Sequence, residues 1–202
     1  MTIPSQQLMA TEIAQLRDEN KRLRDQVHQY REFMAALMEL DRAADRVHNN
    51  EELVHLLSRI LTEALAIVDS QDGSLALLDD EAAELRFVIV HGEAAALLTG
   101  YRMPSDEGIA GWVVAHQQPV RIENARLDER FWPYVDQATG FHTRSILAVP
   151  LIGDDRVLGV VEILNKRGDV PFDELDEALV MLFCRFSGQA LSALDRDLPA
   201  AT

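Results

Sequence analysis

A strand-to-helix corner near the end of the chain places the tightest constraint on its fold. A β-branched run, residues 160–164, leads directly into Asn165 and Lys166, and an apolar-periodic segment follows a short loop. β-branched residues favour strands, whereas apolar residues at steps of three and four favour helices. An acidic pair, Asp176 and Glu177, lies in the first turns of that predicted helix. We therefore expect Lys166 to pair with Asp176 and to hold the intervening loop across the corner.

Phe172 precedes the same helix, at a place where its ring can be buried beneath the loop. Full burial of such a ring stabilises a fold by roughly 2 kcal/mol. The alternative is a solvated loop followed by an acidic helix start, because Asp173 and Glu174 favour the positive end of a helix dipole. The corner is thus defined by five residues, Asn165, Lys166, Phe172, Asp176 and Glu177.

Residues 6–40 contain neither Gly nor Pro and carry a heptad repeat. Leucine dominates one seam position, while the other mixes β-branched residues with one Asn, which favours a parallel two-stranded coiled coil roughly 50 Å long. The predicted dimerisation residues are Ile13, Leu16, Asn20, Leu23, Val27, Tyr30, Met34 and Leu37. The flanking charges agree, since Glu12 and Glu19 would face Arg17 and Arg24 of a partner helix. The alternative is an amphipathic helix packed on its own domain.

The composition limits the partners and the compartment. The 202 residues suffice for one medium-sized domain plus an appendage. A net charge of −15 opposes binding to nucleic acid or to an anionic membrane. No apolar run approaches the roughly 20 residues of a membrane span, and no signal segment begins the chain. The single Cys184 cannot form an internal disulfide, so we expect a cytoplasmic protein.

Strand and helix patterns alternate through the rest of the chain and predict an α+β fold. We expect helices over 50–69, 109–116 and 173–196, a helix or irregular turn over 131–138, and strands over 74–78, 85–90, 101–104, 120–123, 146–152 and 157–165. The predicted units are a coiled-coil helix over 1–48, a globular domain over 49–196 and a tail over 197–202. No further domain is recognisable after Arg196, so we expect output through a separate partner protein.

The corner residues Asn165-Lys166, Phe172 and Asp176-Glu177 resemble the signature of cyclic-nucleotide-binding GAF domains. These are regulatory modules of cyclic-nucleotide phosphodiesterases and of some cyanobacterial adenylyl cyclases. Four more stretches resemble the same family in the same order, namely 73–79, 108–113, 119–122 and 136–150. The resemblance covers about residues 50–195. It implies a six-stranded antiparallel sheet with long terminal helices on one face and a ligand cavity on the other.

Two groups of residues suggest a binding site for a small anion. The segment 108–111, Gly-Ile-Ala-Gly, can open a helix whose bare backbone amides hold a phosphate, although both glycines can equally serve a tight turn. Asp136, Thr139 and Thr143 recur at three- and four-residue steps and can converge on one polar ligand. Local helix capping explains their spacing equally well.

The resemblance assigns roles to these residues. It implies that Asp136, Thr139 and Thr143 contact the base or close the pocket, that Ile109 and Ala110 offer backbone groups, and that Ser74 and Glu162 form the floor. Val90 and His91 stand where the phosphodiesterase pattern has an aromatic ring and an Asp. His91 is then the candidate for contact with a base edge, and the choice between cyclic AMP and cyclic GMP stays open.

Motifs for catalysis are missing. The sequence has no nucleophile elbow, no Gly-rich triphosphate loop and no zinc-ligand spacing. GAF domains that reduce methionine sulfoxide need several cysteines, and this chain has one. We therefore expect a sensor without enzymatic activity, metal or cofactor, whose partners are a small anionic ligand and a second copy of the chain. The alternative is a dimerisation scaffold with an empty cavity.

Overall fold

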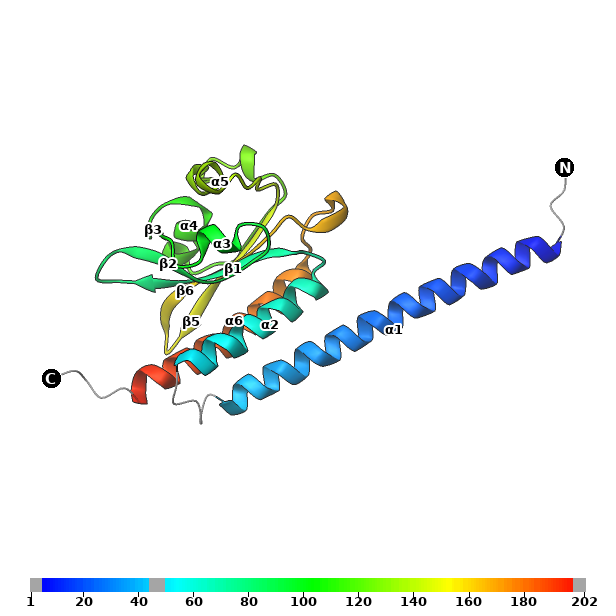
Figure 1. Cartoon of the computed structure of the whole chain (residues 1–202), viewed down its shortest axis with the longest axis horizontal. Helices are drawn as coiled ribbons and strands as arrows, with labels where there is room; N and C mark the ends of the chain where they lie inside the picture. Colours follow the sequence, from blue (N-terminus) through cyan, green and yellow to red (C-terminus); the bar gives the residue numbers. More distant parts are fainter. Residues whose placement is uncertain (1–4, 44–49, 198–202) are drawn as a thin grey trace.

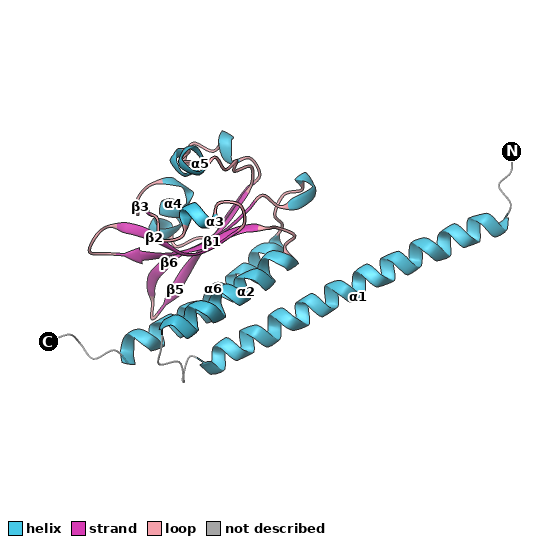
Figure 2. Cartoon of the chain, viewed as in Figure 1, coloured by secondary structure: helices cyan, strands magenta, loops and turns pink. Residues whose placement is uncertain are grey.

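Six antiparallel strands form one sheet in the order β3-β2-β1-β6-β5-β4 (Figures 1 and 2). The computed structural model describes residues 5–43 and 50–197. The strands are β1 (Asp72–Asp79), β2 (Glu84–His91), β3 (Arg102–Pro104), β4 (Val120–Ile122), β5 (Ile146–Gly153) and β6 (Arg156–Leu164). The predicted boundary at 48–49 and the predicted tail beyond Asp197 lie outside the described residues.

The helices lie on both faces of this sheet. They are α1 (Ser5–Ala43), α2 (Asn50–Ile67), α3 (Ala95–Leu98), α4 (Gly108–His116), α5 (Tyr134–Thr139) and α6 (Glu174–Asp197), with 3-10 turns η1 (Ala125–Leu127) and η2 (Arg167–Asp169). Figure 1 shows α1, α2 and α6 on one side of the sheet and α3, α4 and α5 on the other. The α+β class, the six antiparallel strands and the two-sided arrangement are therefore confirmed. Three short elements, α3, η1 and η2, were not predicted.

Two apolar cores follow from this layering, one on each face of the sheet. The helical-side core joins α2 and α6 to the sheet through residues such as Leu61, Val161 and Phe183. The cavity-side core joins α4 to the sheet through residues such as Val113 and Ala148. Alternation along β1, β5 and β6 sends neighbouring side chains to opposite cores, as a pleated strand requires.

A bulge in the pairing of β1 with β2 changes this alternation. The register shifts between Leu75, opposite Ile89, and Ala76, opposite Phe87. Phe87 therefore packs in the cavity-side core, although Ile89, two residues later, packs in the helical-side core. A bulge re-aims side chains in this way because one extra residue is left without a partner.

The last turns of α1 belong to the globular domain. Phe33, Ala36, Leu37 and Leu40 are buried in the helical-side core, and they follow the i, i+3, i+4, i+7 spacing of a helix face that packs on its own domain. The assignment of Leu37 to a dimer seam is therefore corrected. The alternative that the sequence left open, packing of the helix on its own domain, holds for this part of α1.

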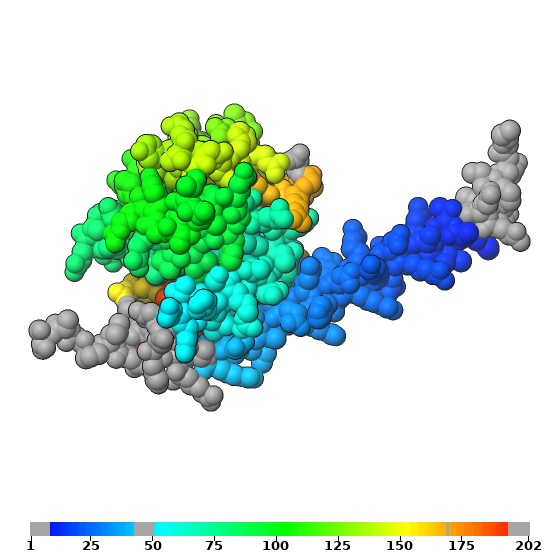
Figure 3. Space-filling model, in the orientation of Figure 1, coloured from blue at the N-terminus to red at the C-terminus, as the bar shows by residue number. Residues whose placement is uncertain are grey.

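The first two-thirds of α1 extend away from the domain (Figures 1 and 3). The predicted seam residues there are largely solvent-exposed within one chain, whereas Tyr30 is half-buried. Exposed apolar side chains among them are Ile13, Leu16, Leu23 and Val27, and Met34 is exposed in the last turns, between the buried Phe33 and Ala36. No described helix has both the length and the apolar character needed to cross a membrane.

The strand-to-helix corner is built from buried polar contacts. Lys166 pairs with Asp176, and only 13% and 8% of the two side chains is exposed. Asp176 also accepts from the backbone amide of Asp173 at 2.8 Å. Phe172 is buried, with the Lys166 ammonium 5.9 Å from its ring centroid. The corner thus joins the end of β6 to the start of α6.

The fifth corner residue links a different strand to the same helix. Glu177 forms an ion pair with Arg121 of β4, and Arg121 Nε lies 2.9 Å from Glu177 Oε2. The edge strand β4 is thereby joined to the first turns of α6. Four of the five corner residues, all but Asn165, therefore make contacts at the start of α6.

The buried pair at the corner predicts a large loss of stability when it is broken. Lys166→Met should lower the free energy of unfolding by about 3 kcal/mol, because it leaves a buried carboxylate without its cation. Arg167→Ala is the matched control, since Arg167 lies 3.5 Å from Asp69 and both side chains are more than half exposed. That change should stay within about 0.5 kcal/mol. Urea unfolding of the two variants measures both values, and equal losses would contradict the prediction.

Candidate functional site

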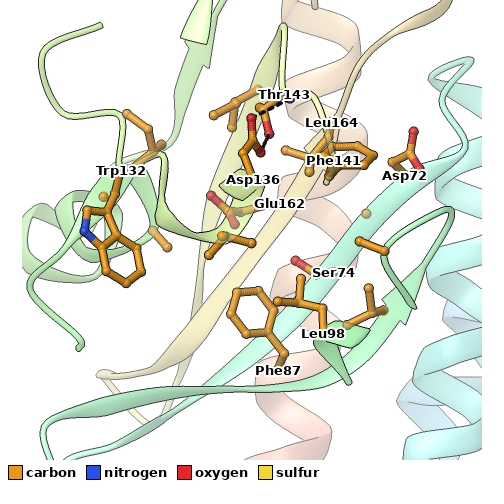
Figure 4. A pocket seen from close by; sticks show the side chains of 18 of the residues that line it. Asp72, Ser74, Phe87, Leu98, Trp132, Asp136, Phe141, Thr143, Glu162 and Leu164 are labelled. Atoms are coloured by element: carbon orange, nitrogen blue, oxygen red, sulfur yellow. Dashed lines mark hydrogen bonds between the residues drawn. The ribbon is translucent and has the colours of Figure 1, made fainter. Parts of the chain in front are cut away.

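A cavity lies between the sheet and the layer formed by α3, α4 and α5 (Figure 4). It encloses about 80 Å³. Pockets for drug-sized ligands usually measure roughly 300 to 1,000 Å³. A ligand the size of a nucleotide would therefore fit only after the surrounding elements move apart.

The floor of the cavity comes from the central strands. Ser74 of β1 is the register partner of both Glu162 on β6 and Val90 on β2. Because register partners lie on the same face of a sheet, all three side chains line the cavity. Ser74 and Glu162 thus lie where the sequence predicted a floor.

Glu162 is the chemically distinctive group of the floor. Its carboxyl has no hydrogen-bond or ion-pair partner within the parts of the chain that the structure describes. Burial disfavours its charged form and raises the pKa of Glu162 to about 7. Near neutral pH this group can therefore either donate or accept a hydrogen bond toward a ligand.

Most of the remaining wall is apolar. It includes Phe87, Leu98, Met103, Ile109, Ile146 and Leu164. Neither Lys nor Arg is among the residues that line the cavity. A negative ligand would therefore depend on backbone amides for its charge.

Helix α4 offers such amides at the cavity wall. The helix begins at Gly108, so the amides of Gly108, Ile109 and Ala110 have no acceptor within it, while Gly111 donates to Glu107 at 3.0 Å. Both glycines also have a structural reason to be there. Gly108 has a φ of +72°, and a Cβ on Gly111 would lie 2.6 Å from the backbone of Asp106.

A buried hydrogen-bond network, here called the roof network, closes the opposite side of the cavity. Asp136 of α5 accepts from Thr143 Oγ1 at 2.6 Å and from the Thr143 amide at 3.0 Å. Arg126 of η1 donates to the same carboxylate at 2.7 Å. Asp136 and Thr143 are both buried and both line the cavity. Their polar groups are therefore engaged with each other in this structure (Figure 4).

Two other residues that were predicted to contact a ligand direct their polar groups away from the cavity. Thr139 does not line the cavity, because its hydroxyl donates to the carbonyl of Val135 at 2.8 Å within α5. This is the local capping that the sequence left as the alternative. His91 reaches the cavity edge, but its Nε2 donates to the Ser58 carbonyl on α2 at 3.0 Å. Its position opposite Gly73, one residue beyond Val90, turns the ring toward the helical side.

Asn165 connects the corner to the roof network. Its amide oxygen accepts from the backbone of Arg144 at 2.7 Å, and its amide nitrogen donates to the carbonyl of His142 at 2.9 Å. These bonds hold the chain on both sides of Thr143. The end of β6 therefore positions the residue that closes the cavity.

The sequence did not reveal Arg126, Trp132 or Phe141 as residues of the site. Arg126 reaches Asp136 because Asn124 caps η1, accepting from the Arg126 amide at 3.2 Å. A lone Arg in a loop carries no spacing signal that could have singled it out. Trp132 and Phe141 line the cavity from segments without helical or strand periodicity.

The GAF domain model matches residues 52–191, about the extent of the sheet and the two helices α2 and α6. The chain belongs to the GAF family. Among its relatives are the Takifugu rubripes dual 3′,5′-cyclic-AMP and -GMP phosphodiesterase 11A, 30% identical over 82% of this chain, and a Caenorhabditis elegans protein named "Probable 3′,5′-cyclic phosphodiesterase pde-5", 31% identical over 75% of it. The GAF chain spans only 19% and 22% of these two relatives.

Solved GAF structures share the fold at lower identity. The GAF domain of the Acinetobacter phosphoenolpyruvate-protein phosphotransferase is 20% identical, with a TM-score of 0.66 over 83% of this chain and 97% of that one. Free methionine-R-sulfoxide reductase from Neisseria meningitidis is 17% identical, with a TM-score of 0.64 over 82% and 92%. These likenesses establish the fold alone.

Cys184 of this GAF domain is unsuited to redox chemistry. It is buried on α6, its thiol donates weakly to the Val149 carbonyl at 3.9 Å, and burial raises the pKa of the thiol. The described residues also include no group of three or more His, Cys, Asp or Glu side chains that could hold a metal ion.

The roof network predicts a measurable cost when its hydroxyl is removed. Thr143→Val should lower the free energy of unfolding by about 1 to 2 kcal/mol, since it leaves one oxygen of buried Asp136 without a donor. Thr139→Val is the matched control, because that hydroxyl is half-exposed, donates within α5 to the Val135 carbonyl and accepts only the long bond from the Phe141 amide at 3.3 Å. Thermal or urea unfolding checks the difference, and a larger loss for Thr139→Val would refute this account of the roof.

Glu162 predicts a defined pH dependence of stability. Its pKa is raised by burial from 4.5 to about 7, so between these values the unfolded state loses a proton that the folded state keeps. Stability should therefore fall as pH rises through that range, by up to about 3 kcal/mol, and this contribution should be constant above it. Glu162→Gln should remove the slope, and the exposed Glu81→Gln should preserve it. Urea unfolding at pH 5 and pH 8 provides the comparison.

Proposed function

We propose that this GAF domain is a non-catalytic sensor whose ligand is a small anion, a cyclic nucleotide. The observation that carries the proposal is the Glu162 carboxyl, which has no partner among the described residues and lies in an apolar cavity beside α4 amides that have no acceptor within their helix. A cyclic nucleotide needs three kinds of contact, for its phosphate, its sugar and its base. The α4 amides suit the phosphate, the apolar wall suits the ring faces, and Glu162 suits a polar base edge.

Ligand entry requires the roof to open. The cavity encloses about 80 Å³, and Asp136 and Thr143 are bonded to each other. A bound nucleotide would displace α5 and the segment up to Thr143, which Asn165 ties to the corner at the start of α6. The sensed signal would then reach the helical layer through β6 and α6. This route supports regulation by ligand rather than a purely structural role.

A small-molecule sensor of this kind would act through the coiled coil. The exposed apolar residues of α1 and the complementary charges beside them support a parallel homodimer, with Asn20 setting its register. A separate output protein would read the state of the dimer. The rival function is a dimerisation scaffold that binds no ligand.

Calorimetry of the full chain with cyclic AMP and cyclic GMP tests the sensor. We expect one site per chain and weaker binding at pH 8 than at pH 6, because ionised Glu162 repels an anionic ligand. The change should be up to about tenfold, equivalent to about 1.4 kcal/mol. Glu162→Gln should abolish this pH dependence. The absence of heat with either nucleotide, from folded and ligand-free protein, would favour the scaffold.

Light scattering of full-length protein tests the dimer. Because the final turns of α1 are part of the core, seam substitutions are better than removal of the helix. The double variant Leu16→Lys, Leu23→Lys should be monomeric at micromolar concentration, since it places like charges along the seam. The control places the same charges on the outer face, as Ala14→Lys, Gln15→Lys, and should stay dimeric. A monomeric wild type would end the dimer proposal.

A further inference from the structure

Four aromatic rings line the cavity, and three of them are already engaged within the protein. Phe87 packs in the cavity-side core and lies 6.4 Å from the Tyr101 ring at a tilt of 46°. Trp132 stacks on Tyr134 with centroids 5.2 Å apart. Phe131 lies beneath the Arg126 guanidinium at 5.7 Å. The geometry of these three rings is explained by contacts within the chain.

Phe141 is the exception. It lines the cavity and is half-buried, yet it packs with neither apolar core and has no ring or cation partner among residues 5–43 and 50–197. The ring is therefore only partly covered by the protein, and it presents surface to the cavity. Figure 4 shows the ring among the side chains around the cavity, drawn between those of Asp136 and Asp72.

The backbone around Phe141 is nevertheless fixed. The Phe141 amide donates to Thr139 Oγ1 at 3.3 Å, and Gly140 before it adopts a φ of +75° that ends α5. After it, Thr143 is bound to Asp136, and the His142 carbonyl accepts from Asn165. A fixed backbone that presents an unused ring to a cavity is preorganised for a ligand.

We propose that Phe141 is the stacking ring of the cavity, against which the planar heterocycle of a ligand lies. The chemical class is a flat, aromatic base such as a purine. On the floor, Val90 offers only an aliphatic face and the Phe87 ring is packed in the cavity-side core beside Tyr101, so the free aromatic face comes from the roof. The inference deepens the proposed function and rests on it, since it names the part of the ligand that the roof reads.

Stacking predicts a particular pattern of affinities. Phe141→Leu should weaken binding about tenfold, and by the same factor for adenine and guanine bases, because every base has a π-face. Phe141→Tyr should bind within about twofold of wild type, since it keeps the ring. Neither change should lower the melting temperature appreciably, because the ring packs in neither core. Leu97→Ala removes an exposed apolar side chain that does not line the cavity and serves as the matched control.

The experiment titrates full-length wild type and the three variants with cyclic AMP, cyclic GMP, free adenine and free guanine. The expected result is loss of affinity in Phe141→Leu alone, with unchanged melting temperature. Binding by folded Phe141→Leu within about twofold of wild type would overturn the inference, as would a fall in its melting temperature typical of a core residue.

Failure of the two proposals can be told apart. Wild type that binds a free base but neither cyclic nucleotide would refute the proposed function, and the effect of Phe141→Leu on the base would still decide the role of the ring. Wild type that binds none of the four compounds would overturn both, because no planar heterocycle would then be held. Cyclic-nucleotide binding that Phe141→Leu leaves intact would overturn the stacking role alone.

Discussion

The polar contacts at the end of β6 are the constraint on which the rest of the domain depends. Lys166 joins the strand to α6 through Asp176, and the neighbouring Asn165 joins it to the segment around Thr143. Two adjacent residues thus bind opposite layers, one the helical side and the other the cavity side. Since both contacts start from one short stretch of backbone, the position of α6 and the closure of the cavity are mechanically linked.

Closure itself has an energetic cost that the domain offsets elsewhere. Asp136 is buried but has donors for both oxygens, whereas the half-buried Glu162 has no donor among the residues that the structure describes. A carboxyl without a donor avoids most of its desolvation cost by staying protonated. The closed state is thus stabilised by the roof network and the apolar wall. A ligand that gives Glu162 a partner would recover part of what its burial costs.

Much of the fold followed from local patterns in the sequence. β-branched runs and helical periodicity gave the strands and the long helices, and charge spacing gave the pairing of Lys166 with Asp176. The features that local patterns did not predict depend on contacts between residues far apart in the sequence. The bulge opposite Leu75 decides where Phe87 points, and the turn of His91 toward Ser58 follows from the pairing of β1 with β2. The contact of Arg126 with Asp136 needs a 3-10 turn that lacks periodicity. For α1 the heptad spacing was read as one seam, whereas the buried stripe that contains Leu37 follows a different spacing.

Because of this division, a rotation of α1 at the domain would also turn the part of the helix that extends away from it. Residues 33–40 pack one end of α1 on the domain, and the predicted seam residues before Phe33 face roughly 100° away around the helix axis, by the 3.6-residue repeat. A rigid helix cannot turn at one end and stay still at the other. In a dimer, the angle between the two domains would therefore be set by how the seam meets its partner. A small repacking around Phe33 would rotate the whole of α1. In a coiled-coil dimer that rotation would change which side chains meet between the two helices.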